Sequence, residues 1–182
     1  MLLYLSIAIL TLGVGSTVYW FRRSSSATSN NSIPLVGADG VAIDAVLTQL
    51  CRSASARISL NIPAGMPRLA LPLDPLTKAL EAILELYCRR NGNAPFLVAM
   101  GKGPVSLEIV FADAASDLRD EERKGFLDWT NPELIARQGV DQRLKEAYDF
   151  LLFLGGKMDV EARLEGGLCL RCRLPLSLGN KA

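Results

Sequence analysis

The chain has 182 residues, 49% of them hydrophobic, and a formal net charge of +1 at pH 7. A chain of this length and composition can bury one hydrophobic core and little else. Its near-neutral charge gives no electrostatic basis for binding nucleic acid or acidic partners in general, so we expect no nucleic-acid function.

The N-terminus predicts a membrane anchor. Residues Leu2–Phe21 contain no charged side chain, and a helix of about 20 residues can cross a hydrocarbon core of about 30 Å. Arg22-Arg23 follow, and the positive-inside rule then places the later residues in the cytoplasm. A cleavable signal peptide is the alternative, but its basic residues would precede the apolar run and a small-residue cleavage site would follow it. We therefore expect an uncleaved single-pass anchor; a reporter enzyme fused to Ala182 would reveal the opposite orientation.

Beyond the anchor, we expect a linker and one folded domain. Ser24–Ile33 is a short polar tract without apolar periodicity, which is typical of a flexible linker. Residues 34–182 then carry the alternating helix and strand patterns of a folded domain.

These patterns predict the elements of the domain in chain order. Apolar residues at three- and four-residue spacing predict helices over Val41–Arg52, Pro75–Arg90 and Leu144–Leu154. Alternating polarity predicts strands over Arg57–Pro63, Leu69–Asp74, Phe96–Met100, Val105–Phe111, Lys157–Leu164 and Leu168–Leu174. Residues 114–142 carry little pattern beyond a mixed-charge run that is typical of a solvated turn or helix face.

The four cysteines are expected to be free thiols, because the predicted compartment is reducing. Cys169 and Cys172 form a CxxC sequence, but residues three apart in a strand point to opposite faces of a sheet. A redox pair prefers a helix N-terminus, and a zinc site would need two further ligands in a chain without histidine. We expect structural cysteines and no metal site.

The C-terminal stretch Leu144–Leu176 carries the clearest resemblance to a known family. Its predicted helix runs into Gly155-Gly156, then a strand, a glycine-rich turn, a second strand and a Leu-Pro-Leu sequence. This order resembles the end of the ATP-binding domain of histidine kinases, the HATPase or GHKL fold, and the resemblance extends over Val41–Leu176. It implies an α+β fold of the Bergerat type, a two-layer sandwich with helices on one face of a mixed sheet.

The resemblance also implies where nucleotide would bind. In the family, one helix presents an acidic residue and then an asparagine that ligates Mg²⁺; Glu85 matches the acidic position, but Leu86 replaces the asparagine. Leucine cannot coordinate a cation that requires oxygen ligands. The aspartate that reads the adenine amino group in the family is retained as Asp113, but the two glycines after it are replaced by Ala115 and Asp117.

The last glycine-rich box of the family is also altered. It aligns with residues 139–143, where only Gly139 remains. In the family these glycines let helix-end amides approach the triphosphate, whereas Asp141 would repel it and Arg143 would fill the space. We therefore expect no catalytic residue and no ATP or Mg²⁺ cofactor, with Glu85, Asp113 and Gly139 as vestiges of a lost site.

The chain contains no histidine, which excludes autophosphorylation on its own histidine and a histidine phosphotransferase. We expect a pseudo-enzyme of the bacterial inner membrane that binds or scaffolds proteins in two-component-type signalling. Its partner would be a histidine kinase, a response regulator, a membrane complex or a second copy of the chain. One alternative is an unconventional ATP-binding kinase or ATPase that uses Glu85 and Asp113; another is a structural subunit of a membrane assembly.

Two aromatic residues are candidates for a partner surface. Phe150 and Phe153 fall outside the apolar stripe assigned to the Leu144–Leu154 helix, and exposed aromatic side chains often anchor interfaces. We hypothesise that Phe150 contributes to such a surface, together with the exposed side of the Val41–Arg52 helix. The competing interpretation is that a wider core buries both side chains, and we favour it for Phe153.

Overall fold

A mixed β-sheet forms one layer of the domain. The computed structural model describes residues 36–37, 40–114, 120–130, 142–162 and 167–176, which lie within one compact unit, Pro34–Ala182. In these ranges, five strands pair in the order β3-β4-β5-β7-β6. They are β3 (Ile58–Asn61), β4 (Phe96–Lys102), β5 (Ser106–Ala112), β6 (Lys157–Ala162) and β7 (Leu168–Pro175). β3 and β4 run parallel, and every other pair in this sheet is antiparallel.

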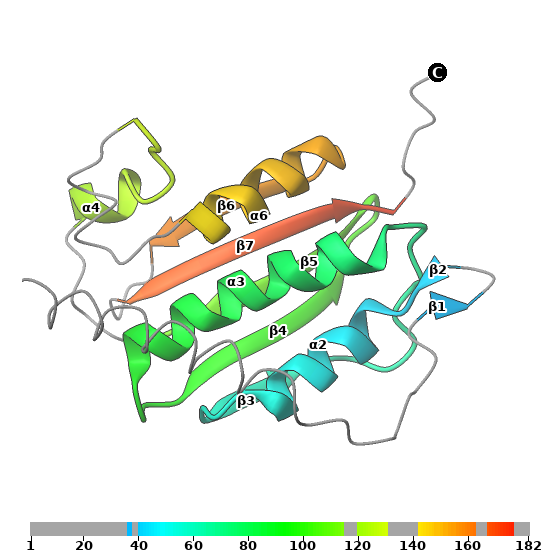
Figure 1. Ribbon diagram of the computed structural model, residues 1–182, viewed down its shortest axis with the longest axis horizontal. Helices are drawn as coiled ribbons and strands as arrows, with labels where there is room; N and C mark the ends of the chain where they lie inside the picture. The colour runs from blue at the N-terminus through cyan, green and yellow to red at the C-terminus, as the bar shows by residue number, and fades with distance from the viewer. Residues whose placement is uncertain (1–35, 38–39, 115–119, 131–141, 163–166, 177–182) are drawn as a thin grey trace, which may run out of the picture. The chain divides into compact units, whose positions relative to one another are not determined.

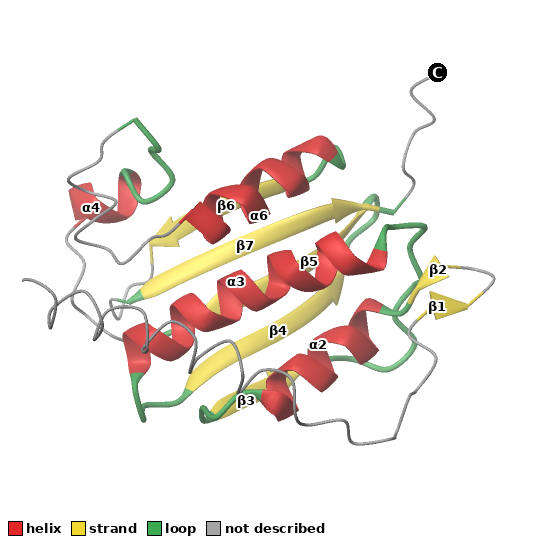
Figure 2. Cartoon of the chain, viewed as in Figure 1, coloured by secondary structure: helices red, strands yellow, loops and turns green. Residues whose placement is uncertain are grey.

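Helices form the second layer. The helices α2 (Ile43–Ser53), α3 (Leu73–Asn91) and α6 (Gln142–Phe153) lie over one face of the sheet (Figures 1 and 2). The described residues also include the short helix α4 (Asp120–Lys124) and a small hairpin of β1 (Val36–Gly37) and β2 (Gly40–Val41). The predicted α+β sandwich with a mixed sheet is therefore confirmed.

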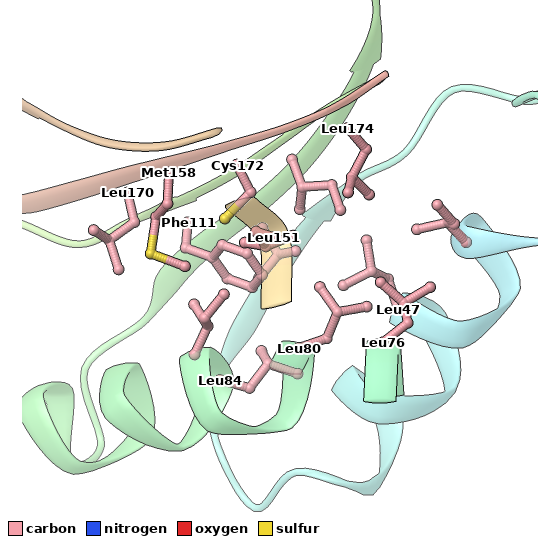
Figure 3. Packing of buried hydrophobic residues seen from close by; sticks show 14 of the residues in the cluster. Leu47, Leu76, Leu80, Leu84, Phe111, Leu151, Met158, Leu170, Cys172 and Leu174 are labelled. Atoms are coloured by element: carbon pink, nitrogen blue, oxygen red, sulfur yellow. The ribbon is translucent and has the colours of Figure 1, made fainter. Parts of the chain in front are cut away.

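The core lies between the two layers. The leucines of α3 point toward β5 and β7, where alternate residues face the helices (Figure 3). Leu107, Ile109 and Phe111 of β5 are all fully buried. Each such side chain stabilises the fold by roughly 1.5–3 kcal/mol, so the predicted apolar patterns account for the arrangement of these elements.

Two glycines end α6 for different reasons. Gly155 has a φ of +73°, a conformation that glycine adopts readily and other residues do not. At Gly156 the backbone packs so closely that a Cβ atom would collide with the carbonyl oxygen of Arg173 in β7. The sequence interpretation of this pair as a helix stop is confirmed, and Gly156 is required in addition for close packing of α6 on the sheet.

The predicted strand over Leu69–Asp74 is wrong. Within it, only Leu69 forms a β-bridge to another segment, through Val41. Helix α3 already begins at Leu73, since Pro72 adopts an extended conformation at the helix N-cap and Pro75 is tolerated in the first turn. The alternation of apolar residues here reflects contacts with the core.

The first predicted helix also starts too early. Val41 belongs to β2, where it pairs with Val36, and α2 begins only at Ile43. Val41 is nevertheless fully buried, because its bridge to Leu69 holds it beneath the helical layer. Val41 therefore fitted the apolar spacing of the predicted helix, although it lies in the strand before it.

The predicted membrane anchor and linker lie outside the described residues. Among the residues that are described, no helix is long and apolar enough to cross a membrane.

The sheet face opposite the helices carries a lattice of paired charges on β5, β6 and β7. Arg173 lies directly opposite Glu108 and contacts Asp159 at 2.6 Å, while Arg171 contacts Glu108 at 2.7 Å and Glu161 at 2.7 Å. Hydrogen bonds from Arg173, and then from Arg171, lower the pKa of the Glu108 carboxyl below its usual value. Opposite charges on neighbouring strands therefore stabilise this face as cross-strand pairs.

This lattice predicts an acid-sensitive contribution to stability. Because the pKa of Glu108 is lowered in the folded state, its contribution is complete above the ordinary carboxyl pKa and is lost as pH falls through the folded value. Glu108→Gln should therefore lose less stability than the unchanged chain when pH falls from about 6 to about 3. Urea unfolding followed by circular dichroism measures this, and identical pH dependence in both proteins would contradict it.

Candidate functional site

Tyr87 of α3 links the two central strands of the sheet. Its hydroxyl donates to the carbonyl of Phe111 at 2.7 Å and accepts from the backbone N–H of Leu170 at 3.1 Å. The ring is fully buried and packs on Phe96 and Phe111, with centroid distances of 5.4 and 5.9 Å. Burial raises the pKa of Tyr87 well above its usual value. The hydroxyl therefore stays protonated and holds the last turns of α3 against β5 and β7.

Asp113, which follows β5, is a buried carboxylate with partners on two elements. Its Oδ1 accepts a hydrogen bond from the backbone N–H of Leu168 at 2.8 Å. Its Oδ2 accepts from Nε of Arg90 and from Nδ2 of Asn91, both at 3.2 Å. Asp113 is 1% exposed, and a carboxylate so far from water is tolerated only when it is paired and hydrogen-bonded. The carboxylate thus joins the end of α3 to the start of β7.

Gly167 packs directly against Asp113. Its φ is +85°, and a Cβ atom there would lie 2.8 Å from Oδ1 of Asp113 and would collide with the Asp113 carbonyl oxygen. Glycine is therefore required at this position both for its backbone conformation and for its lack of a side chain.

The helix positions expected to contact Mg²⁺ have other partners. Leu86 is buried in the hydrophobic core, with 1% of its surface exposed. Glu85 is about half exposed and forms an ion pair with Arg143 of α6. Burial raises the pKa of nearby Glu81, while Arg143 acts in the opposite direction. A surface ion pair of this kind contributes about 0–1 kcal/mol, so the Glu85–Arg143 pair mainly orients α3 and α6.

The structure brings some predicted site residues together and leaves others apart. Glu85 and Arg143, 58 positions apart in the sequence, meet in one ion pair, whereas Asp113 pairs with Arg90 instead. Four further predicted positions lie outside the described residues: Ala115, Asp117, Gly139 and Asp141.

The residues that complete the surroundings of Asp113 carry little signal in the sequence. Tyr87 lies within the predicted helix Pro75–Arg90, where it fits the apolar spacing, but its hydroxyl, which requires a partner when buried, indicates a polar contact. Arg90 and Asn91 lie at the helix end and carry no motif. Gly167 was assigned only to a turn, because contact with a distant carboxylate leaves no local signal.

The prediction that Phe150 is exposed and Phe153 is buried is wrong. Phe150 is half-buried and packs against Ala79, Ala82 and Ala147, where two helices approach closely. Phe153 is 85% exposed. The apolar stripe of α6 is wider than assigned on the side of Phe150, because alanines on α3 leave room for its ring.

Metal and thiol chemistry find little support among the described residues. No group of three or more histidine, cysteine, aspartate or glutamate residues there could hold a metal ion. The cysteines are free thiols, and burial raises the pKa of Cys51 to about 11 and that of Cys172 to about 12. Thiols with such pKa values carry almost no reactive thiolate at neutral pH.

The fold is that of the catalytic domains of histidine kinases, the HATPase type. The catalytic domain of histidine kinase ThkA is similar, with a TM-score of 0.59 and 10% identity over 75% of this chain and 93% of that chain. The mycobacterial sensor histidine kinase MprB has a TM-score of 0.54 and 16% identity, over 73% of this chain and 93% of that chain. The ATP-binding domain of PrrB from Mycobacterium tuberculosis has a TM-score of 0.51 and 19% identity, over 74% and 90%.

These identities show the fold alone. No protein-family model matches the chain, and no curated protein matches it either.

The contact between Gly167 and Asp113 predicts an unequal response of two glycines. Gly167→Ala should lower the free energy of unfolding by at least about 2 kcal/mol more than Gly155→Ala. Both positions have positive φ, so both variants incur a backbone cost of about 1–2 kcal/mol, but only at Gly167 does the added methyl meet other atoms. Urea unfolding of both variants measures the difference. Equal losses would show that the packing of Gly167 on Asp113 is looser than described.

Proposed function

We propose that the chain is a membrane-anchored HATPase-like module that no longer binds nucleotide and that acts by binding proteins, in the setting of two-component-type signalling. The observation that carries this proposal is the internal pairing of Asp113. The anchor rests on the sequence of Leu2–Phe21, and the signalling context rests on the sensor kinases that share the fold.

The pairing of Asp113 supports the loss of adenine recognition. In the family that the sequence resembles, this carboxylate accepts a hydrogen bond from the adenine amino group. Here Nε of Arg90 and Nδ2 of Asn91 already donate to it. The Arg90 side chain is only 6% exposed, so adenine would have to displace a buried guanidinium from its carboxylate. Removing one partner from a buried ion pair costs about 3–5 kcal/mol, which would cancel most of the gain from binding the base.

The helix that would hold Mg²⁺ supports the same conclusion. Leu86 provides no oxygen ligand, and its burial leaves no path for it to turn toward a phosphate. The neighbouring Glu85, which an ATP-dependent enzyme would need for chemistry, is paired with Arg143. Both positions therefore contribute to packing between α3 and the rest of the domain.

A retained fold without a nucleotide site leaves protein binding as the function that fits best. Exposed aromatic residues are the usual anchors of such surfaces, and Phe153 is the large apolar side chain with the greatest exposure among the described residues. Leu152, beside it at the end of α6, is 44% exposed. We assign this end of α6 to the contact with a kinase, a response regulator or a second copy of the chain.

The proposed function predicts that the chain does not bind nucleotide. Calorimetric titration of the full chain in detergent micelles with millimolar Mg-ATP should give no saturable heat. The Asp113 carboxylate already accepts hydrogen bonds from Arg90 and Asn91, and Leu86 provides no ligand for Mg²⁺. Hydrolysis of ATP should likewise stay at the background rate. A saturable signal would overturn the proposed loss of nucleotide binding. Turnover that is lost in the variant Glu85→Gln would favour an ATP-dependent enzyme.

The proposed function also predicts that the end of α6 at Phe153 is needed for binding a partner. Phe153→Asp should keep its circular dichroism spectrum and melting temperature, since the side chain is 85% exposed, but should lose self-association or the protein that co-purifies from native membranes. Val105→Asp is the matched control, because Val105 is 74% exposed at the turn between β4 and β5. Binding that survives in Phe153→Asp, or that is lost equally in both variants, would contradict the assignment.

A further inference from the structure

We infer that Tyr87, Asn91 and Asp113 form a clasp that makes the last turn of α3 and the adjoining ends of β5 and β7 open and close as one unit. This conformational device goes beyond the proposed function and does not depend on it, because it concerns only contacts within the domain. It would carry a displacement at the end of the helix to the adjoining ends of β5 and β7.

The clasp begins at the end of α3. Asn91 is the last residue of α3, and its Nδ2 donates to the carbonyl of Tyr87, one turn earlier in the helix, at 2.9 Å. The same nitrogen lies 3.2 Å from Oδ2 of Asp113. Asn91 therefore ties the final turn both to itself and to the residue that follows β5.

The strand ends are held partly by side chains. Asp113 donates from its backbone N–H to the carbonyl of Leu168 at 3.0 Å, but the N–H of Leu168 donates to the carboxylate of Asp113 rather than to a backbone carbonyl. Two register pairs further along, the hydroxyl of Tyr87 bridges Phe111 and Leu170. The protection of these strand amides therefore depends on side chains that α3 positions.

An ordinary sheet end would behave differently. Strand ends commonly fray on their own, and a helix end then frays independently of them. Contacts that do not communicate change stability additively, whereas residues within one hydrogen-bond network deviate from additivity. If the clasp exists, a substitution at the end of α3 changes exchange at strand amides that the substituted side chain does not contact. If the ends fray independently, it does not.

Amide hydrogen exchange on the full chain in micelles tests the clasp. Asn91→Ala removes contacts to Tyr87 and Asp113 only, yet it should accelerate exchange at Leu168 and Leu170 by roughly three- to tenfold, the range expected for loss of one hydrogen bond. Conversely, Tyr87→Phe should accelerate the amide of Gly92, which donates to the carbonyl of Cys88 at the helix end. Exchange at Ile109, in the middle of β5, should stay unchanged in both variants.

A substitution in another helix serves as the control. Thr48→Val removes a side-chain bond of 2.7 Å to the carbonyl of Asp44 in α2, and it should leave Leu168 and Leu170 unaffected. If Asn91→Ala accelerates only the helix amides, the strands do not sense the helix and the inference fails. If Ile109 accelerates as much as Leu168, the variants only unfold the whole domain, and a separate unit is again contradicted.

Discussion

The structure depends on a carboxylate that has no access to water. Asp113 follows β5 and lies close to α3 and β7, and the cost of burying its charge is met by donors from the helix α3 and the strand β7. Removing a donor would leave the charge unpaired, so each partner is needed for a reason beyond its own contact. Gly167 keeps space for the carboxylate, and Tyr87 fixes the strands on either side. Asp113, which aligns with an adenine-binding residue of the family, therefore contributes to the stability of this fold.

The proposed loss of nucleotide binding is compatible with the fold, because the Asp113 carboxylate is paired within the domain. Among the described residues, Leu86 is the one nucleotide-binding position of the family that belongs to the hydrophobic core between the helices and the sheet. Leu86 itself adds to that core, so replacing a metal ligand there gains buried apolar area. Most of the described core is therefore separate from the positions that the family uses for recognition, whereas Asp113 and Leu86 contribute to the stability of this domain.

Sequence patterns predicted the elements well where the pattern had a single cause. Alternation along β5 and β7 arises from one buried face, and it gave the correct strands. It failed at Leu69–Asp74, where the same alternation arises from core contacts of an irregular segment and prolines set the backbone. Glu85 and Arg143 were predicted separately, and their meeting could not be foreseen, because a contact across 58 residues depends on how two helices pack. The preference between Phe150 and Phe153 depended in the same way on the alanines of the neighbouring helix.

The edge position of β3 has a mechanical consequence. β3 is joined to the sheet by four parallel register pairs, whereas β5 and β7 share seven antiparallel ones. Chain entering the domain from the N-terminal side reaches the sheet first through α2 and β3. A pulling force applied from that side would load the shortest strand of the sheet, and β3 would detach while the pairing of β4, β5, β7 and β6 remains in place. Tension at the N-terminal end is thus borne by a peripheral strand and kept away from the centre of the sheet.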